Sequence, residues 1–312
     1  MAEAIHAAVE SCGMPSGVFS LIQGGNRAVG QAVVQHPRIK AVGFTGSLAG
    51  GRALFDLCAA RPEPIPFFGE LGSVNPMFML PAAMAARAEE LGKGWAASLT
   101  MGAGQFCTNP GIAVVIDGPG ADAFVQNAAT ALQDVAPQVM LTDGIAEAYC
   151  AGRDKFKSAP SLRQVHLADS EGRTAAPALF ETTGEEFKAN PALHEEVFGP
   201  LGLVVRVSSL EEMRALALEL DGQLTITLHM DDADVDAARD LMPVLERKAG
   251  RLLANGFPTG VEVVDSMVHG GPYPASTNFG ATSVGTLSIR RFLRPVSYQN
   301  LPEALLPEDA AE

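Results

Sequence analysis

The sequence predicts an α/β protein with a doubly wound parallel sheet and a second α/β unit. Short β-prone runs alternate with helical stretches along most of the chain, which is typical of parallel strands joined by helices. Of the 312 residues, 47% are hydrophobic, which is enough to fill two cores. Only 19% are charged, and this balance argues against a disordered chain.

The first 72 residues are predicted to alternate between helices and extended segments. In chain order these are a helix over 1–9, a strand over 18–22, a helix over 27–35, a strand over 41–44, a helix over 48–60 and an extended segment over 64–68. No capping residue precedes the first helix, so we expect the chain to begin inside a helix. Neither Gly24-Gly25 nor Gly46-Ser47 has the G-x-G-x-x-G spacing, so an ordinary dinucleotide-binding turn is not expected.

The second α/β unit begins near Ser73 and contains longer elements. We predict helices over 82–101, 121–135, 210–219 and 233–245, and strands over 112–116, 201–207, 224–229 and 251–254. Residues 269–288 are rich in Gly, Pro, Ser and Thr, which predicts a long loop that crosses back to the first unit. A late edge strand is predicted over 295–300.

Charge and hydropathy exclude several classes of partner. The net charge of −14 and a pI near 4.9 argue against nucleic acid or an anionic membrane surface. Charged residues interrupt the most hydrophobic region, so no segment is predicted to span a membrane. No signal peptide is visible, and the cysteines are few and widely spaced, so a cytoplasmic protein with reduced thiols is expected.

The most informative segment is GQFCTNP, residues 104–110. It follows a long apolar helix, and Pro110 prevents a further one. A thiol at such a junction can point into a cleft, where backbone N–H groups can receive a developing negative charge. A lone cysteine is more often a small packing residue, and that is the role we predict for Cys12, Cys58 and Cys150.

Two other segments contain glutamates that could take part in chemistry. Glu70 follows two phenylalanines in a Gly-rich strand-to-loop segment, where burial would raise its pKa toward a useful value for a general base. The alternative is a solvated or helix-capping carboxylate. Glu195 and Glu196 form an acidic pair beside His194, but adjacent residues lack metal-ligand spacing, so no metal is expected.

Taken in order, these segments resemble the aldehyde dehydrogenase superfamily. ELGSVNP at 70–76 resembles the family's E-L-G-G-x-N-P, and GQFCT at 104–108 resembles G-Q-x-C-x. EEVFGP at 195–200 resembles E-E-x-F-G-P, and GFTGS at 43–47 resembles the F-T-G-S cofactor turn. The resemblance extends over most of the chain and implies a partial doubly wound cofactor domain followed by a complete α/β catalytic domain.

The resemblance implies the catalytic roles. Cys107 would attack an aldehyde to form a thiohemiacetal and, after hydride transfer to NADP or NAD, a thioester. Glu70 would activate the water that hydrolyses the thioester. Phe257 and Thr259 would line the substrate channel, although no group for a distal substrate carboxylate can be named.

The resemblance also implies the cofactor contacts, which are Gly46, Ser47, Leu71, Glu196 and Phe198. Glu196 would bind ribose hydroxyls and Phe198 would pack beside the nicotinamide. The helix that begins after Ser47 would favour the cofactor phosphates, because helix N-termini attract anions. Ser47 as an ordinary N-cap is a compatible alternative.

Three details narrow the resemblance to one branch of the family. These are Ser73 in place of the usual glycine, the nucleophile loop 101–110 and the loop 255–263. They resemble the branch that oxidises 2-oxoglutarate semialdehyde (2,5-dioxopentanoate), usually with NADP. The implied domains are residues 1–72 (the last part of the NAD(P)-binding domain), 73–270 (the catalytic domain) and 271–312 (a return segment with a strand that pairs in a homo-oligomer).

Family members carry a further segment before the point that matches Met1. It contains an asparagine of the oxyanion hole and a lysine that contacts the adenosine ribose or its phosphate. We therefore expect this chain to correspond to a C-terminal portion and to have little dehydrogenase activity by itself. Two alternatives remain: an inactive structural or interaction fragment, and a thiol esterase that needs no cofactor.

Overall fold

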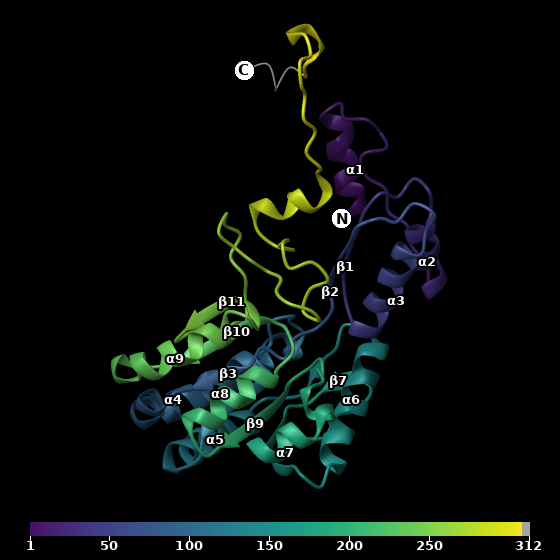
Figure 1. Ribbon diagram of the computed structural model, residues 1–312. Coiled ribbons are helices and arrows are strands. Elements are labelled where there is room, and N and C mark those ends of the chain that lie inside the picture. The colour runs from purple at the N-terminus through teal and green to yellow at the C-terminus, as the bar shows by residue number, and fades with distance from the viewer. Residues whose placement is uncertain (308–312) are drawn as a thin grey trace.

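One large sheet and two small ones organise the chain in the computed structural model, which describes residues 1–307 (Figure 1). The strands are β1 (Val42–Thr45), β2 (Phe67–Glu70), β3 (Met77–Met79), β4 (Ile112–Ile116), β5 (Gln138–Val139), β6 (Arg163–Leu167), β7 (Thr174–Ala175), β8 (Ala178–Thr183), β9 (Leu201–Val207), β10 (Gln223–His229) and β11 (Ala249–Ala254). The large sheet has the order β11-β10-β3-β4-β9-β8-β6, in which β6 is antiparallel to β8 and the other pairs are parallel. The pairs β1-β2 and β5-β7 form the small sheets.

Helices cover both faces of the large sheet. The α-helices are α1 (Ala2–Ser11), α2 (Arg27–Gln35), α3 (Leu48–Ala59), α4 (Pro81–Thr100), α5 (Pro119–Gln133), α6 (Asp143–Ser158), α7 (Gly184–Ala189), α8 (Leu210–Glu219) and α9 (Val235–Leu245). Short 3-10 turns are η1 (Met101–Gly104), η2 (Pro191–His194), η3 (Asp232–Asp234), η4 (Thr286–Phe292) and η5 (Glu303–Leu305).

The alternating side chains of the central strand β3 show which helices cover each face of the large sheet. In β3, Met77 and Met79 pack with α4 and α5, whereas Phe78 packs with the helices of the opposite face, α6 to α9. Successive side chains of a strand point to opposite faces, and both faces of this strand are apolar because both are covered. Gly92 allows α4 to approach α5 closely, since a Cβ there would lie 2.4 Å from the Phe124 carbonyl oxygen.

The β1-β2 sheet has a smaller core. Five buried hydrophobic residues form it, and α2 contributes only Val34. A long loop returns from the large sheet to β2, where Thr277 exchanges hydrogen bonds with Phe67 and Gly69 and Ser276 bridges Glu70. This contact places the end of β2 against the segment that follows β11.

Several sequence predictions are confirmed by the structure. The α/β class is correct, and the helices predicted over 27–35 and 210–219 and the strands predicted over 112–116 and 201–207 have the predicted bounds. α6, α7, β6 and β8 were not predicted. The three-domain division remains a proposal.

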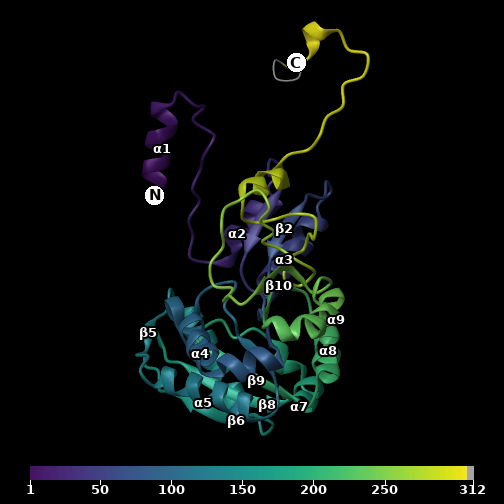
Figure 2. The ribbon, with the colours of Figure 1, turned by 90° about the vertical axis from the view of Figure 1, so that its left-hand side faces the viewer.

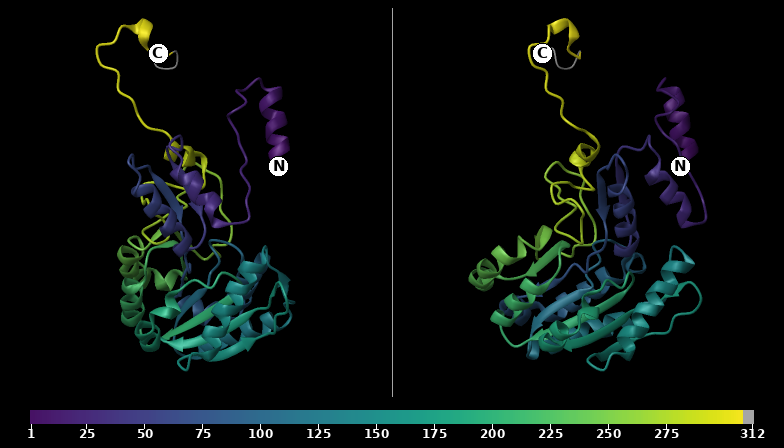
Figure 3. Two further views of the ribbon diagram at one scale, coloured as in Figure 1. Left: turned by 90° about the vertical axis from the view of Figure 1, so that its right-hand side faces the viewer. Right: turned by 45° about the vertical axis from the view of Figure 1, so that its right-hand side comes forward.

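One predicted strand is wrong. Residues 18–22 form no strand, and Val18, Leu21 and Ile22 are exposed, because no other described strand lies beside them to accept their hydrogen bonds. Residues 295–300 pair with no strand among the described residues, and their pairing with a neighbouring subunit stays a prediction. Figures 2 and 3 show α1 (purple) and the C-terminal stretch (yellow) standing clear of the sheets.

The burial of the cysteines and the hydropathy of the helices can be compared with the sequence predictions. Cys58 is buried as predicted for a packing residue, but Cys12 is exposed, because no residue of α1 is buried. No helix within residues 1–307 combines the length and the apolar character that a membrane span requires.

Candidate functional site

Glu70, Cys107 and His269 lie close together between the β1-β2 sheet and the large sheet. Glu70 ends β2, Cys107 follows η1, and His269 lies in the loop after β11. Cys107 Sγ is 3.3 Å from His269 Nε2, which is 3.3 Å from Glu70 Oε2. Glu70 and His269 are buried, with 6% and 2% of their surface exposed, whereas Cys107 is partly accessible. The thiol is therefore in contact with solvent on one side and with titratable side chains on the other.

The backbone before Cys107 has an unusual conformation. Gly102, Ala103 and Gly104 have φ values of 57°, 59° and 66°, in the left-handed region that favours glycine. A Cβ on Gly104 would lie 2.3 Å from the carbonyl carbon of Gly199, so this contact requires glycine. The N–H of Ala103 donates to Gln138 Oε1 (3.0 Å), which helps to hold the one non-glycine residue in this run.

A buried amide fixes the loop on its other side. Asn75 Nδ2 donates to the carbonyl oxygens of Cys107 (2.9 Å) and Asn109 (3.0 Å). Asn75 Oδ1 accepts from Thr225 Oγ1, and Ser73 Oγ lies 2.8 Å from the same oxygen. The hydroxyl of Ser73, where the family pattern has glycine, thus joins the network that positions the nucleophile loop.

The electrostatics of the three side chains differ from the sequence-based expectation. Burial alone would raise the pKa of Glu70, but hydrogen bonds from His269 and Ser283 outweigh it, and the pKa of Glu70 is lowered. Ser283 Oγ donates to Glu70 Oε2 at 2.7 Å. The expectation of a raised Glu70 pKa is therefore wrong, because the sequence did not show that two donors from a distant loop face the carboxylate.

The Cys107 thiol has the opposite shift. Burial, followed by the negative charge of Glu70, raises the pKa of Cys107 to about 12. Cys107 is consequently a thiol at neutral pH, and it needs a base to become a nucleophile. His269 Nε2 contacts both groups, so it can accept the thiol proton only in the tautomer that carries its hydrogen on Nδ1; the Nε2–H that results then faces the Glu70 carboxylate, which stabilises the imidazolium.

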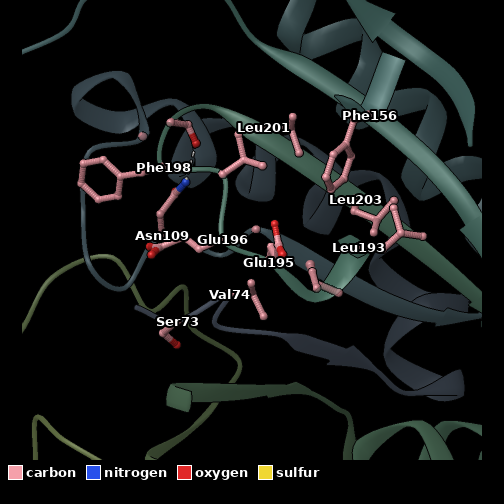
Figure 4. A pocket seen from close by; sticks show the side chains of 15 residues that line it. Ser73, Val74, Asn109, Phe156, Leu193, Glu195, Glu196, Phe198, Leu201 and Leu203 are labelled. Atoms are coloured by element: carbon pink, nitrogen blue, oxygen red, sulfur yellow. Dashed lines mark hydrogen bonds between the residues drawn. The ribbon is translucent and has the colours of Figure 1, made fainter. Parts of the chain in front are cut away.

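Glu196 and Phe198 line a pocket beside this centre (Figure 4). Glu196 retains exposed surface at the pocket, but the protein around it and the charge of Glu70 raise the pKa of Glu196 to about 8. A Cβ on Gly72 would lie 2.8 Å from Glu196 Oε2, so glycine makes room for this carboxylate. The pocket also contains Ser73 and Asn109, which links it to the loop of Cys107.

A larger cavity of about 630 Å³ lies between α2 and α3. Its wall includes Gly24, Gly25, Arg27 and Ser47. Ser47 Oγ accepts from the N–H of Gly50, so Ser47 caps α3 and also faces the cavity. The volume is within the range of small-molecule and cofactor sites, roughly 300–1,000 Å³.

Gly46 and Leu71, the other predicted cofactor contacts, line neither pocket. The N–H of Gly46 donates to the carbonyl oxygen of Glu70. The Leu71 side chain is buried in the small core, and its N–H donates to Ala275. Any contact of Leu71 with a ligand would therefore use its backbone carbonyl.

The predicted substrate residues are held away from both pockets. Phe257 packs over Gly94 of α4 and lies 5.1 Å from the His229 ring, while Thr259 Oγ1 is 2.6 Å from Ser98 Oγ. Arg251 of β11 anchors this loop through the carbonyl oxygens of Pro258 and Gly260.

Sequence reasoning missed three side chains at these sites. His269 was assigned only to a loop, although it is a histidine directly before Gly270-Gly271 in a Gly-rich segment. Arg27 follows a Gly-Gly-Asn turn at the first position of a helix, and this position could have suggested an anion site. Arg251 carries no sequence signal, because only the tertiary structure brings its guanidinium close enough for Cys107 to affect its pKa.

Comparison with known proteins gives consistent matches. The model of the "Aldehyde dehydrogenase family" matches residues 1–149. The chain is 52% identical over 311 residues to "Alpha-ketoglutaric semialdehyde dehydrogenase 2" of Azospirillum brasilense, and 44% identical over 311 residues to "Alpha-ketoglutaric semialdehyde dehydrogenase" of Acinetobacter baylyi. Each match covers 99% of this chain but 59% of the relative, so the chain spans about three-fifths of the length of these curated relatives.

Solved structures show the same fold. Proline utilization A of Bradyrhizobium japonicum is similar with a TM-score of 0.76 and 25% identity, over 93% of this chain and 29% of that one. A 1-pyrroline-5-carboxylate dehydrogenase is similar with a TM-score of 0.75 and 20% identity, over 93% of this chain and 56% of that one.

Proposed function

We propose that the chain belongs to the aldehyde dehydrogenase family, whose model matches residues 1–149, and that its Cys107 site oxidises an aldehyde to a carboxylate with NADP or NAD. The observation that carries the proposal is the contact of the Cys107 thiol with His269, and of His269 with the Glu70 carboxylate. The chain spans only part of its relatives, so the activity in their names enters here as a proposal.

The residues of the chain carry the covalent steps. His269 takes the thiol proton as Cys107 Sγ adds to the carbonyl carbon, which forms a thiohemiacetal. The bound nicotinamide would supply the hydride acceptor, and a thioester remains on Cys107. Glu70 then takes a proton from a water molecule as that water attacks the thioester; the carboxylate is released and the departing Cys107 sulfur recovers its proton from His269.

We propose 2-oxoglutarate semialdehyde as the substrate. The names of the two relatives at 52% and 44% identity support this choice. A dicarboxylic semialdehyde needs a cation for its distal carboxylate. Arg251 is half-buried, its Nε has no hydrogen-bond partner among the described residues, and it lies close enough to Cys107 for an ionised thiolate there to raise its pKa.

We propose NADP as the preferred cofactor, bound between α2 and α3. Arg27 is the one charged residue among those that line this cavity, and it is exposed there. A guanidinium can bind a phosphate through two parallel hydrogen bonds, which favours a phosphorylated ribose over a free one. Glu196 and Phe198 would contact the nicotinamide half in the neighbouring pocket.

A homo-oligomer is also proposed. Leu293, Val296, Tyr298 and Leu301 are exposed along the C-terminal stretch, where the sequence predicted an intersubunit strand. Size-exclusion chromatography with light scattering would test it, and a monomer at all concentrations would contradict it.

The test uses the chain with Glu70→Gln, which should trap the thioester. We expect mass spectrometry to find an acyl adduct on Cys107 only when 2-oxoglutarate semialdehyde and NADP are both present. Cys150→Ser in the same background is the matched control and should acylate equally. An adduct that forms equally without NADP, or none on Cys107, would overturn the proposal.

Thiol esterase activity is a second candidate, favoured by the contact of Cys107 Sγ with His269 Nε2. A histidine beside a thiol can activate it as a nucleophile without a cofactor. The assay is hydrolysis of an activated ester without NADP or NAD. Hydrolysis that depends on Cys107, together with no hydride transfer to either cofactor, would favour this function over aldehyde oxidation.

A further inference from the structure

We propose that Glu70, Cys107 and His269 also bind a thiophilic divalent cation such as Zn²⁺, and that the bound ion blocks the nucleophile. Binding of the ion does not depend on the proposed function, whereas the resulting inhibition rests on it. Sγ, Nε2 and a carboxylate oxygen of these residues all lie within 4.8 Å of one another. Thiolate, imidazole and carboxylate are the three ligand types that zinc takes in proteins.

The distances suit a tetrahedral ion. Zn–S of about 2.3 Å and Zn–N of about 2.0–2.1 Å place sulfur and nitrogen roughly 3.5 Å apart at a tetrahedral angle, and nitrogen and oxygen roughly 3.4 Å apart. The observed Sγ–Nε2 and Nε2–Oε2 distances are both 3.3 Å. These two edges would need shifts of a few tenths of an ångström, the sulfur and the carboxylate oxygen lie within 4.8 Å of each other, and the fourth position would remain for water.

The donors are held in place by residues around them. Asn75 donates to the carbonyl oxygen of Cys107. The Ser283 hydroxyl can donate either to Glu70 Oε2 or to the carbonyl oxygen of His269. Such outer contacts orient metal ligands and raise affinity. The partly accessible Cys107 provides the side from which an ion can enter.

Both acidic and basic side chains lie near the three metal-binding donors. Glu196 adds a negative charge near Cys107 only when its carboxyl, with a pKa of about 8, is ionised, whereas Arg251 and Arg291 lie close enough for Cys107 and Glu70, respectively, to affect their pKa. A soft ion that forms a covalent-like bond to sulfur depends less on this balance than a hard cation does. We therefore expect Zn²⁺ to bind and Mg²⁺ not to bind.

Binding changes the chemistry of the thiol directly. The Zn–S bond forms as the thiol proton leaves to solvent, and His269 binds through the Nε2 lone pair with its proton on Nδ1. The sulfur electron pair that would attack an aldehyde and the carboxylate oxygen of Glu70 are then both engaged. No oxidant or reductant is required, and a chelator reverses the binding.

The experiment measures metal binding and thiol reactivity on the full chain, reduced and freed of metal. Calorimetric titration with ZnCl₂ should give one strong site, which is lost in Cys107→Ser and in His269→Gln. Cys12→Ser and His6→Gln are matched controls at exposed positions and should retain it. Loss of the strong site in these controls, or its retention in Cys107→Ser, would overturn the proposal.

Alkylation provides a second measurement that does not rely on the variants. Zinc should slow iodoacetamide labelling of Cys107 by roughly tenfold or more, EDTA should restore it, and MgCl₂ should have no effect. CoCl₂ should produce a thiolate-to-cobalt absorption band that vanishes when Cys107 is alkylated first. Unchanged labelling with zinc would refute the site even if the proposed oxidation, assayed in EDTA, is confirmed.

Discussion

The thiol site and the cavity between α2 and α3 differ in how the chain holds their side chains. At the thiol site, Glu70, Cys107 and His269 come from distant segments and are fixed by buried hydrogen bonds from Asn75 and Ser283. The cavity is lined mainly by exposed residues and glycines, and α2 buries only one residue. The chemical centre is therefore preorganised within this chain, while the proposed nucleotide site depends on a small two-stranded sheet.

This difference has a consequence for mutations. Changes at the thiol site should alter reaction steps, because catalysis requires accurate positions of reacting atoms. Changes at the cavity should alter affinity with little effect on the covalent steps. Changes in α1, which buries no residue, should alter neither.

The largest effect is expected for Cys107→Ser. Because a serine hydroxyl is far less acidic and less nucleophilic than a thiol, we expect aldehyde oxidation by the complete protein to fall by roughly a thousandfold or more. Steady-state reduction of NADP measures the effect, with Cys150→Ser as the control. Retention of more than about a tenth of the turnover would exclude Cys107 as the nucleophile.

Glu70→Gln should have the next largest effect, on a single step. Loss of a general base typically costs about 10²–10⁴-fold, so hydrolysis of the thioester should slow while its formation continues. Rapid mixing with substrate should show a burst of reduced cofactor followed by a slow steady rate. If both phases fall equally, Glu70 has another role.

Arg27→Ala should produce a moderate change confined to the cavity. A charged hydrogen bond is worth about 1.5–3 kcal/mol, less when exposed, so NADP should bind about five- to tenfold more weakly. The Kd for NAD, measured in the same titration, should not change. Equal weakening of both cofactors would mean that Arg27 does not contact the additional phosphate.

Glu196→Gln should change the pH dependence of stability. The folded pKa of Glu196, about 8, lies above its ordinary value of 4.5, so the folded state binds the proton more tightly. The stabilisation by the protonated carboxyl is present below pH 4.5 and is lost as the pH rises toward 8. The Tm advantage of the glutamine variant should therefore grow over this interval, and a constant difference would contradict the assigned pKa.

The smallest effect is expected in α1. Ile5 is only partly buried, so Ile5→Ala should change the free energy of unfolding by less than about 0.5 kcal/mol. Phe78→Ala in the core of the large sheet is the comparison and should cost about 3–5 kcal/mol. Denaturant titration of both variants measures the contrast. A similar loss of unfolding free energy in both variants would contradict the exposed position of α1.

Local sequence patterns were sufficient for most helices and for several strands. The amphipathic spacing over 210–219 and the apolar run over 201–207 give the correct bounds, because short-range side-chain periodicity follows from the face that becomes buried. The same logic failed for residues 18–22. β propensity favours an extended chain, but a strand exists only where a neighbour accepts its hydrogen bonds.

The sequence by itself determined which side chains to propose for the chemistry at the thiol site: the motifs around Glu70 and Cys107 predict a base and a nucleophile. It did not determine their ionisation. Only the tertiary structure brings His269 and Ser283 to Glu70, and this lowers the pKa of Glu70 although burial alone would raise it. Protonation depends on the atoms within a few ångströms of a carboxylate, and here those atoms belong to a loop that lies far away along the chain.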